Sequence, residues 1–386
     1  MRACRLLLLA VLITVLGQPG CKRKSGSNQV APAPSPSAAA PDQYHHPEGG
    51  NTPAGETKYF KGSIGSALDL QMKITREGDK LTGTYFYQKV GTKIDLKGSV
   101  DKQGNVALEE FDAGGKQTGL FKGFWKGGED GLISFAGNWS KPNSDKQIAF
   151  SLHEEPIEFT SAVDIVAKQI KENNKQLMYA IDVQYPQLTG PTNPHIDKFN
   201  QAVKTLVTRK ITEFKTAVTG ADREVPPSGS MASDLSTGYT IVMARDDLIS
   251  VQFDFSDYYS GAAHPNSYSQ PINFDLKNGK PLKLVDLFKP EARYLPVISA
   301  YCITDLKKQS KERGPDAMLD NAQVQSGAAA NPKNYQSWTI NKRSLEINFD
   351  PYQVAPYAAG PQHVSVPYSA LKDLINPEGP IGQFVK

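Results

Sequence analysis

A five-residue pattern that recurs between residues 56 and 155 restricts the folds open to this chain. Each copy has an apolar residue, any residue, a glycine, any residue and a second apolar or aromatic residue, and the central glycines are Gly62, Gly83, Gly98, Gly123 and Gly137. Side chains two residues apart share a face of a strand, so each copy places two large side chains on one face with a glycine between them. Such a glycine permits a bend or the close approach of a neighbouring strand, as at the corners of small barrels. Residues 56–155 are therefore predicted to form a small antiparallel β-barrel or sandwich.

The repeat contains two tryptophans, Trp125 and Trp139, for which two alternative roles are considered. One role is to line a ligand pocket in the β domain, and the other is to pack in its core. Core packing is the favoured interpretation, because large aromatic side chains dominate the energetics of protein cores.

The first 21 residues are typical of an export signal. Arg2 and Arg5 form a short positive segment, and an apolar run covers residues 6–16. An apolar run of this length rises about 16 Å as a helix, roughly half the hydrocarbon core of a bilayer. A signal peptide therefore fits better than a membrane-spanning helix.

The end of this segment resembles the processing site of bacterial lipoproteins. Gly20 and Cys21 match the small residue and the acylated cysteine of that site, whereas Gln18 and Pro19 depart from its usual pattern. We expect lipid on Cys21, which would anchor the exported protein to a membrane of the cell envelope, in the periplasm or at the cell surface. A plain secretory signal is the alternative.

Residues 22–55 are rich in Lys, Ser, Ala, Pro and Gly and have no apolar periodicity. This composition predicts a disordered, flexible tether. His45 and His46 lie in it beside Glu48. We interpret them as a solvated linker pair rather than as a metal site.

Charge and cysteine content narrow the classes of function. The chain has 43 basic and 40 acidic side chains, without the clustering of basic residues that nucleic-acid binding requires. Cys4 lies in the signal and Cys21 would carry lipid, so Cys302 is left alone in the folded part and an intramolecular disulfide is excluded. Cys302 lies four residues from both Ile298 and Leu306 in a helical pattern, which predicts a buried and unreactive thiol.

Residues 156–386 mix the periods of strands and helices. Strands are predicted over residues 164–170, 179–185, 239–243 and 249–255, with a hairpin over 337–349. Helices are predicted after an N-cap at Asn193, over 291–311, and near Tyr368. This region is therefore expected to be an α+β domain, with helices packed on one face of an antiparallel sheet.

The chain lacks the motifs of common enzyme and metal sites, among them phosphate-binding glycine loops, HExxH, GxSxG and paired cysteines. No cofactor and no metal site are expected. His264, in a loop of small residues after a strand, is the one histidine with a possible catalytic role. A general base needs an orienting carboxylate, and strand alternation does not bring Asp254 and Asp257 together. An envelope hydrolase that uses His264 on peptidoglycan or polysaccharide is kept as the alternative function.

Three features of this region resemble one family of extracytoplasmic domains. They are the Tyr, Gly, Ala, His, Pro run through His264; Asn273, Phe274 and Asp275, followed by Gly-Lys at 279–280 and by the Leu, Asp, Leu and Phe within 284–288; and FDPYQVAPYAAG at 349–360 with VSVPY at 364–368. Together they resemble the C-terminal domain of the anti-sigma factor RsiV, a domain type that also occurs beside the catalytic domain of the peptidoglycan deacetylase PdaC. The resemblance covers about residues 156–376 and leaves the β domain outside it.

The resemblance implies a binding module. In RsiV this region is extracytoplasmic and senses lysozyme by binding it, and in PdaC the chemistry belongs to another domain that has no counterpart here. A cytoplasmic sigma-binding segment is not expected, because five residues precede the apolar run. We therefore expect a non-catalytic envelope lipoprotein that binds a lysozyme-like protein or a cell-wall glycan.

Two loops of the α+β domain combine Tyr, Pro, Gly and Ala, and both follow strongly alternating strands. The first carries Tyr258, Tyr259 and His264, and the second carries Tyr352 and Tyr357. A rigid sheet commonly presents recognition residues on such loops. These five residues are the predicted ligand-binding site, although a structural role in covering the end of the sheet is the alternative.

Overall fold

The computed structural model describes residues 55–65, 68–87, 93–128, 131–160, 162–220 and 231–385. The expected signal peptide, Cys21, His45 and His46 lie outside the described residues. Within the described ranges, no helix has the length and apolar character needed to cross a membrane.

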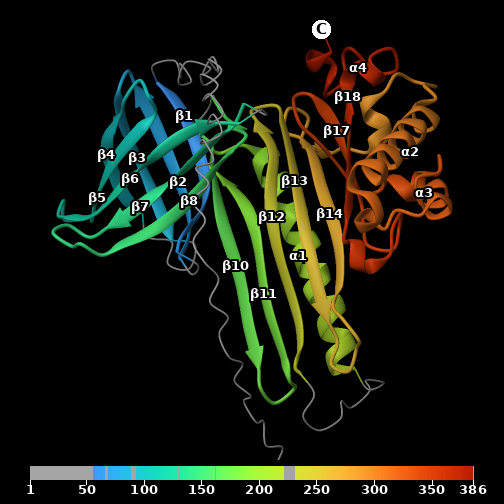
Figure 1. Ribbon diagram of the computed structural model, residues 1–386, viewed down its shortest axis with the longest axis horizontal. Coiled ribbons are helices and arrows are strands. Elements are labelled where there is room, and N and C mark those ends of the chain that lie inside the picture. The colour runs from blue at the N-terminus through green and yellow to red at the C-terminus, as the bar shows by residue number, and fades with distance from the viewer. Residues whose placement is uncertain are drawn as a thin grey trace, which may run out of the picture. The chain divides into compact units, whose positions relative to one another are not determined.

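Eight antiparallel strands close into a barrel, each paired with the next in sequence and the last with the first (Figure 1). They are β1 (Glu56–Ile64), β2 (Leu68–Glu77), β3 (Lys80–Tyr87), β4 (Ile94–Val100), β5 (Asn105–Phe111), β6 (Gln117–Gly127), β7 (Ile133–Ser140) and β8 (Gln147–Glu155). The expected antiparallel β domain is confirmed, and its form is a closed barrel.

The glycines of the repeat lie where neighbouring strands approach closely. A Cβ added to Gly98 would lie 1.9 Å from the Ala107 carbonyl oxygen, on the adjacent strand. A Cβ on Gly62 would meet the Ser151 carbonyl oxygen at 2.0 Å. The predicted close approach is confirmed, since a side chain at either position would collide with backbone that cannot move aside.

The large side chains of the repeat fill the barrel. Phe60, Phe121, Trp125 and Phe135 are buried in one core cluster, and Trp139 packs against it. The Trp125 ring lies 5.7 Å from Phe60 and 6.2 Å from Phe135, centroid to centroid. The interpretation of Trp125 as a core residue rather than a pocket residue therefore fits the structure.

A long sheet of seven strands follows the barrel. Its strands are β9 (Ile157–Glu158), β10 (Asp164–Asn174), β11 (Tyr179–Thr189), β12 (Ser233–Arg245), β13 (Leu248–Tyr258), β14 (Asn266–Asp275) and β15 (Lys280–Pro281). The α+β class is confirmed, but the sheet is not antiparallel throughout, because β11 and β9 each pair with β12 in parallel. The reason is the helix between β11 and β12, which carries the chain back so that β12 starts at the same end as β11.

Helix α1 (Pro194–Thr219) covers one face of the long sheet (Figure 1). The Asn193 side chain accepts a hydrogen bond from the His195 backbone nitrogen at 2.9 Å, and Pro194 is the first helical residue. The buried stripe of the helix comprises Ile196, Phe199, Val203, Leu206, Val207, Phe214 and Val218. The predicted cap is thus confirmed, and this stripe packs on the apolar face of the sheet.

The rest of the chain forms a C-terminal lobe around a separate three-stranded sheet. Its strands are β16 (Trp338–Ile340), β17 (Ser344–Phe349) and β18 (Gln362–Pro367), and its helices are η1 (Leu284–Leu287), α2 (Tyr294–Arg313), η2 (Gly314–Ala317), α3 (Asn321–Gly327), η3 (Pro332–Tyr335), η4 (Tyr357–Ala359), α4 (Tyr368–Leu371) and η5 (Gly382–Phe384). The expectation of a single sheet was wrong. The predicted hairpin, β16 and β17, pairs with β18 in a sheet of its own and does not join the long sheet. Side chains link it to the long sheet instead, as where Asn273 Nδ2 donates to the Trp338 carbonyl oxygen at 2.8 Å.

Cys302 of α2 is fully buried in the core of this lobe. Burial raises the pKa of its thiol to about 12. The predicted buried thiol is confirmed, and at neutral pH it stays protonated.

Candidate functional site

Two loops that are far apart in the sequence meet beside the C-terminal lobe. The loop after β13 carries His264, and the loop after β17 carries Tyr352 and Tyr357. The His264 ring stacks on Tyr357 with centroids 4.0 Å apart, and His264 Nε2 lies 3.1 Å from the Tyr352 hydroxyl oxygen. The rings of Tyr352 and Tyr357 are 5.6 Å apart. These three residues form what we call the aromatic cluster.

Hydrogen bonds fix the two loops to each other and tie the second loop to strand β14. The Tyr357 hydroxyl donates to the Pro265 carbonyl oxygen at 2.7 Å. Asp350 Oδ1 accepts bonds from the Ser269 backbone nitrogen at 2.9 Å and from its hydroxyl at 2.7 Å. Since Ser269 is in β14 and Asp350 directly follows β17, these bonds hold the ends of the two sheets together beneath the cluster.

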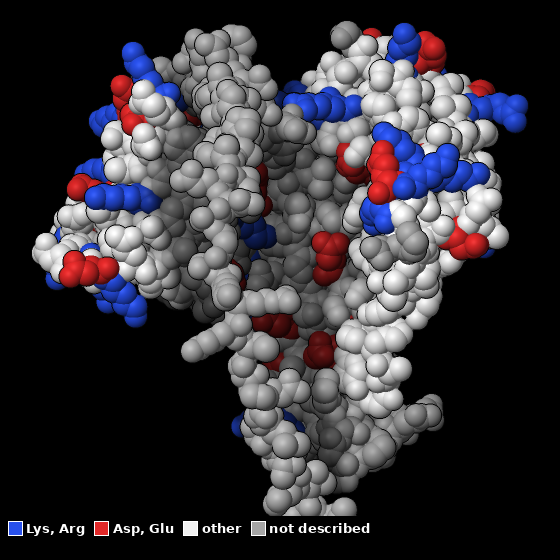
Figure 2. Space-filling model, in the orientation of Figure 1, with Lys and Arg blue, Asp and Glu red and all other residues white. Residues whose placement is uncertain are grey.

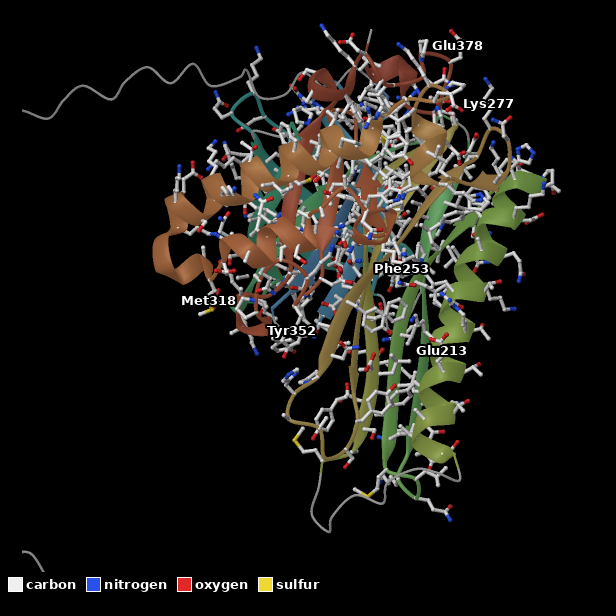
Figure 3. All side chains as sticks on the ribbon, turned by 90° about the vertical axis from the view of Figure 1, so that its right-hand side faces the viewer. Glu213, Phe253, Lys277, Met318, Tyr352 and Glu378 are labelled. Carbon is white, nitrogen blue, oxygen red and sulfur yellow. The ribbon has the colours of Figure 1, made fainter. Side chains whose placement is uncertain are left out.

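Tyr352 is the most prominent member of the cluster. Its side chain is 59% exposed, and its backbone has φ +73°, in the left-handed region that side chains other than glycine rarely adopt. Gln323 Nε2 donates to the Tyr352 carbonyl oxygen at 2.9 Å, which helps to hold this conformation. Figure 3 shows Tyr352 at the margin of the lobe. Backbone strain of this kind is concentrated at ligand-contacting positions.

The other two predicted residues lie apart from the cluster. Tyr259 packs on Phe214 of α1, with ring centroids 5.7 Å apart, and burial raises the pKa of its hydroxyl. Tyr258 is the last residue of β13 and pairs with Asp234 of β12. Neither ring contacts His264 in the part of the chain that the structure describes. The structure thus brings together three of the five predicted residues, and binding by Tyr258 and Tyr259 stays a prediction.

The surroundings of His264 contain its aromatic neighbours rather than an acid. Its Nδ1 lies 2.8 Å from the Pro265 carbonyl oxygen, and its Nε2 faces Tyr352. Among the described residues, no carboxylate forms a hydrogen bond or ion pair with His264. Asp257 points to the face of the sheet that α1 covers and Asp254 to the opposite face, as the alternation of β13 predicts.

The face of the long sheet that α1 leaves open carries acidic side chains. By strand alternation and register, Asp182, Asp234 and Asp254 point to this face. Figure 2 shows acidic side chains over the middle of the sheet, where the surface is hollowed. Asp182 is paired with Lys171 at 3.0 Å, whereas Asp234, Asp254 and the neighbouring Asp350 have no ion-pair partner within the described ranges. We call these last three residues the acidic face.

Desolvation affects two carboxyl groups of the acidic face. Burial raises the pKa of Asp350, the hydrogen bonds from Ser269 oppose that rise, and the charge of Asp254 adds to it. Partial burial also raises the pKa of Asp234. A cationic partner would relieve both effects, since an opposite charge favours the ionised form.

Sequence reasoning missed the acidic face. Asp234 and Asp350 lie outside the strands predicted from the sequence or directly after one, so alternation could not assign them to a face. The signal that could have found Asp254 was the outward position of this residue in the predicted strand 249–255. In the described ranges, no group of three or more His, Cys, Asp or Glu side chains is arranged to hold a metal ion.

Models of two families match this region of the chain. Residues 285–369 match "Protein of unknown function (DUF3298)", and residues 170–267 match "Deacetylase PdaC". The matches cover most of the long sheet, helix α1 and most of the C-terminal lobe, and they leave out the barrel. The resemblance to the domain type of RsiV and PdaC is confirmed.

Three similar proteins illustrate the extent of this likeness. Peptidoglycan-N-acetylmuramic acid deacetylase PdaC of Bacillus subtilis (strain 168) is 27% identical over 180 residues, 46% of this chain and 36% of the relative. Anti-sigma-V factor RsiV of the same organism is 28% identical over 212 residues, 54% of this chain and 68% of the relative. The chain therefore spans about a third of the length of PdaC. The crystal structure of a DUF3298 family member from Bacteroides fragilis NCTC 9343 has 18% sequence identity and a TM-score of 0.44, and the match covers 58% of this chain and 98% of that one.

Proposed function

We propose that this protein is a non-catalytic component of the cell envelope that binds an extracytoplasmic protein through the aromatic cluster and the acidic face. The proposed partner is a basic, lysozyme-like protein, and a cell-wall glycan is the second candidate. In this proposal Cys21 carries the lipid anchor, residues 22–55 are the tether, and residues 56–155 and 156–386 are two domains.

The observation that carries the proposal is the exposed aromatic cluster. Tyr offers a large contact area and a hydroxyl at low entropic cost, which suits protein and sugar recognition. His264, Tyr352 and Tyr357 are held against one another by ring and hydroxyl contacts, so little ordering remains for the binding step. A preorganised aromatic anchor of this kind is typical of a binding hot spot.

The acidic face favours a basic protein over a neutral glycan. Asp234, Asp254 and Asp350 have no ion-pair partner among the described residues, and Asp350 is two residues from Tyr352. Unpaired carboxylates next to an aromatic anchor attract a cationic surface and raise its rate of association. Lysozyme is the partner that the sequence resemblance implies.

Relatives support an envelope role and keep the glycan as second candidate. The name of PdaC describes a deacetylase of peptidoglycan, and that of RsiV an anti-sigma factor. The observation in favour of a glycan partner is that the name of PdaC refers to peptidoglycan. Sugar rings stack on exposed aromatic side chains, so the aromatic cluster would serve that ligand as well.

Hydrolysis at His264 is the less supported alternative. A general base needs an orienting acid, and the described neighbours of His264 are Tyr352, Tyr357 and the Pro265 carbonyl oxygen. Incubation of the protein with peptidoglycan separates the two functions. An enzyme would release soluble fragments and lose that activity in His264→Ala, whereas a binding protein has no activity to lose.

The proposal is tested by titrating residues 55–386 with hen lysozyme and, separately, with soluble peptidoglycan fragments, using calorimetry. The double variant Tyr352→Ala/Tyr357→Ala should weaken lysozyme binding by about 2 kcal/mol or more if these residues are hot spots. Asp254→Asn should lower the association rate and its dependence on salt.

Phe124→Ala is the matched control, because Phe124 is 43% exposed but lies on the barrel. The Phe124→Ala variant should leave the affinity for lysozyme unchanged. A separate variant, Tyr259→Ala, should show whether Tyr259 contributes to binding. Binding of the glycan alone would favour the second candidate. Lysozyme binding that is equally strong in the Tyr352→Ala/Tyr357→Ala variant, with a normal melting temperature, would move the site elsewhere.

A further inference from the structure

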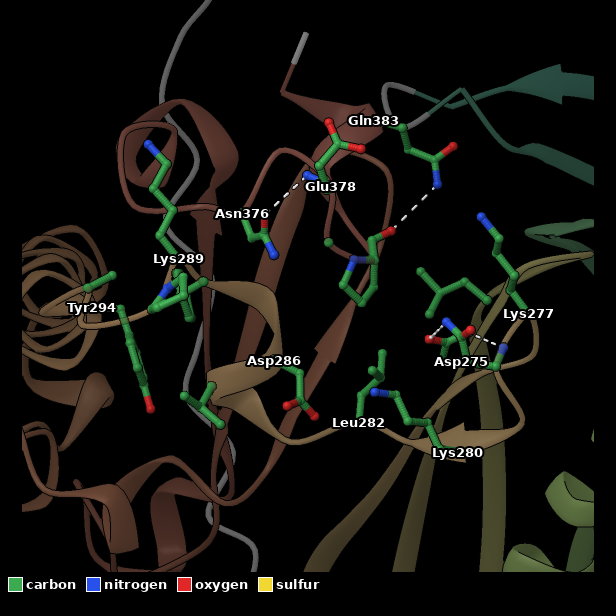
Figure 4. A pocket seen from close by; sticks show the side chains of 18 of the residues that line it. Asp275, Lys277, Lys280, Leu282, Asp286, Lys289, Tyr294, Asn376, Glu378 and Gln383 are labelled. Atoms are coloured by element: carbon green, nitrogen blue, oxygen red, sulfur yellow. Dashed lines mark hydrogen bonds between the residues drawn. The ribbon is translucent and has the colours of Figure 1, made fainter.

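A cavity of about 810 Å³ lies outside the aromatic cluster and the acidic face (Figure 4). One side is formed by the turn after β14 and the start of β15, with Lys277 and Lys280, and the other by η1 and the C-terminal segment, with Asp286 and Glu378. Cavities of this size are typical of small-molecule sites.

Hydrogen bonds hold the two sides of the cavity in place. Asn376 donates from its backbone nitrogen to the Leu287 carbonyl oxygen at 3.1 Å, which ties the C-terminal segment to η1. Gln383 Nε2 donates to Asp247 Oδ2 at 2.9 Å, and Gln383 Oε1 accepts from Arg245 at 2.9 Å. The C-terminal segment is thus fastened at both ends, and the cavity is part of the folded structure.

The floor of the cavity is apolar. Leu248, Leu282 and Phe288 are buried beneath it, and Tyr294 stacks on Phe288 with centroids 4.3 Å apart. Val285 lines the cavity and is 51% exposed, so its side chain is free to contact a ligand.

Two ammonium groups of the wall lack a polar partner in the part of the chain that the structure describes. Lys277 and Lys280 form no hydrogen bond or ion pair with any described residue. In contrast, both carboxylate oxygens of Asp275 already accept hydrogen bonds. The backbone nitrogen of Asn278 donates to Oδ1 at 2.8 Å, and its Nδ2 donates to Oδ2 at 2.7 Å. A ligand anion would therefore find unpaired donors on the side of the cavity that carries the lysines.

The mixed charges of the lining favour a ligand that carries both signs of charge over one that carries a single sign. The lining contains five carboxylates and three lysines, so a ligand with negative charge alone would be repelled by the acids. Asp286 uses Oδ2 to accept the Lys283 backbone nitrogen at 2.8 Å, and its other oxygen has no donor among the described residues. Figure 4 shows the Lys280 and Asp286 side chains on facing sides of the cavity.

We propose that this cavity is a second binding site, for a small dipolar ligand of the amino-acid or short-peptide class. The ligand carboxylate binds Lys280, its ammonium group binds Asp286 on the facing side, and its apolar part rests on Val285 and the floor. This site shares no residue with the aromatic cluster or the acidic face, so its ligand would not compete directly with the proposed protein partner.

Equilibrium dialysis of the full chain against radiolabelled alanyl-alanine tests the proposal. The dipeptide with free termini should bind, and the same dipeptide with acetylated and amidated termini should not. Lys280→Met keeps the aliphatic stem and removes the charge, and Asp286→Asn keeps an acceptor for the Lys283 nitrogen. Each should weaken binding by about tenfold or more, as expected for a hydrogen bond to a charged group.

Lys333→Met is the matched control, because Lys333 is an exposed lysine of η3 that does not line the cavity. It should bind the dipeptide as the wild type does, and melting curves establish that each variant is folded. Absence of dipeptide binding, equal binding of the free and the capped dipeptide, or unchanged affinity in Lys280→Met would overturn the proposal.

Discussion

The Lys61 ammonium group donates a hydrogen bond to the Tyr239 carbonyl oxygen at 2.9 Å and lies 4.0 Å from the centroid of the Tyr239 ring. Lys61 belongs to β1 of the barrel and Tyr239 to β12 of the long sheet, 178 residues further along the chain. Gln71 extends this contact, because its Nε2 donates to the Tyr239 hydroxyl at 3.3 Å and its Oε1 accepts the Ala167 backbone nitrogen at 3.2 Å. The barrel and the long sheet therefore share a junction of polar and charged groups.

This junction modifies the expectation that the barrel folds by itself. The barrel has its own apolar core, so residues 56–155 expressed alone should melt cooperatively. Loss of the hydrogen bonds to the sheet should lower its stability by about 1 kcal/mol or more. For a domain of this size that corresponds to a fall in melting temperature of about 4–8 °C relative to the barrel in the whole chain. Circular dichroism melts of both proteins measure it, and a molten fragment would mean that the barrel requires its neighbour.

Glu155 gives the junction a dependence on pH. Burial raises the pKa of Glu155 above its ordinary value of 4.5, and the charge of Lys61 opposes that rise. The native state therefore holds this proton more tightly than the unfolded chain does, so the associated stability is present below about pH 4.5 and is lost as pH rises through the raised pKa. Glu155→Gln lacks this titration. Its free energy of unfolding, relative to that of the wild type, should therefore be greater at about pH 8 than at about pH 5.

Urea unfolding of both proteins at the two pH values measures that difference. Glu109→Gln is the control, since Glu109 is an exposed carboxylate on the outer face of the barrel. Its difference from wild type should be the same at both pH values. If Glu155→Gln behaves in the same way as this control, the burial of Glu155 does not influence stability.

Gly98→Ala should destabilise the barrel, because the added Cβ would lie 1.9 Å from the Ala107 carbonyl oxygen and 2.9 Å from the Leu108 Cα. Overpacking of this kind costs about 1–3 kcal/mol, and here both neighbours are backbone atoms of β5, which favours the upper end of that range. Gly127→Ala is the control, since nothing lies within 4 Å of its added Cβ, and its effect should stay within about 0.5 kcal/mol. Equal stability of the two variants in urea would refute the close-approach role of the repeat.

Cys21→Ser should release the protein from membranes. The prediction follows from Gly20, Cys21 and the short apolar run before them. Membrane fractionation with labelled fatty acid measures it, with Cys302→Ser as control, because this thiol is buried and should carry no lipid. A Cys21→Ser variant that stays in the membrane fraction, together with wild type that takes up no label, would point to another anchor.

Features with local causes could be predicted from the sequence. The N-cap of α1 was predictable because Asn193 bonds a backbone nitrogen two residues away. The glycine repeat predicted a β domain because alternation in a strand depends on neighbouring residues alone. The same reasoning singled out the two Tyr-rich loops, since each directly follows an alternating strand.

Features that depend on long-range pairing could not be predicted. The parallel pairing of β11 with β12 and the separate sheet with β18 follow from how distant segments meet, which single-strand periodicity does not encode. The same limit applies to Tyr259, which the sequence groups with His264 but the fold packs on Phe214.

The sequence by itself determined the local units of this protein: barrel strands with glycines at their close contacts, a capped amphipathic helix, and two loops rich in tyrosine. Only the tertiary structure decided that His264, Tyr352 and Tyr357 share one site, that carboxylates without an ion-pair partner among the described residues lie beside it, and that Lys280 faces Asp286 across a cavity. The physical reason is that periodicity and capping act between residues close in the chain. Contacts across the fold depend on strand register and core packing, which the whole chain sets together.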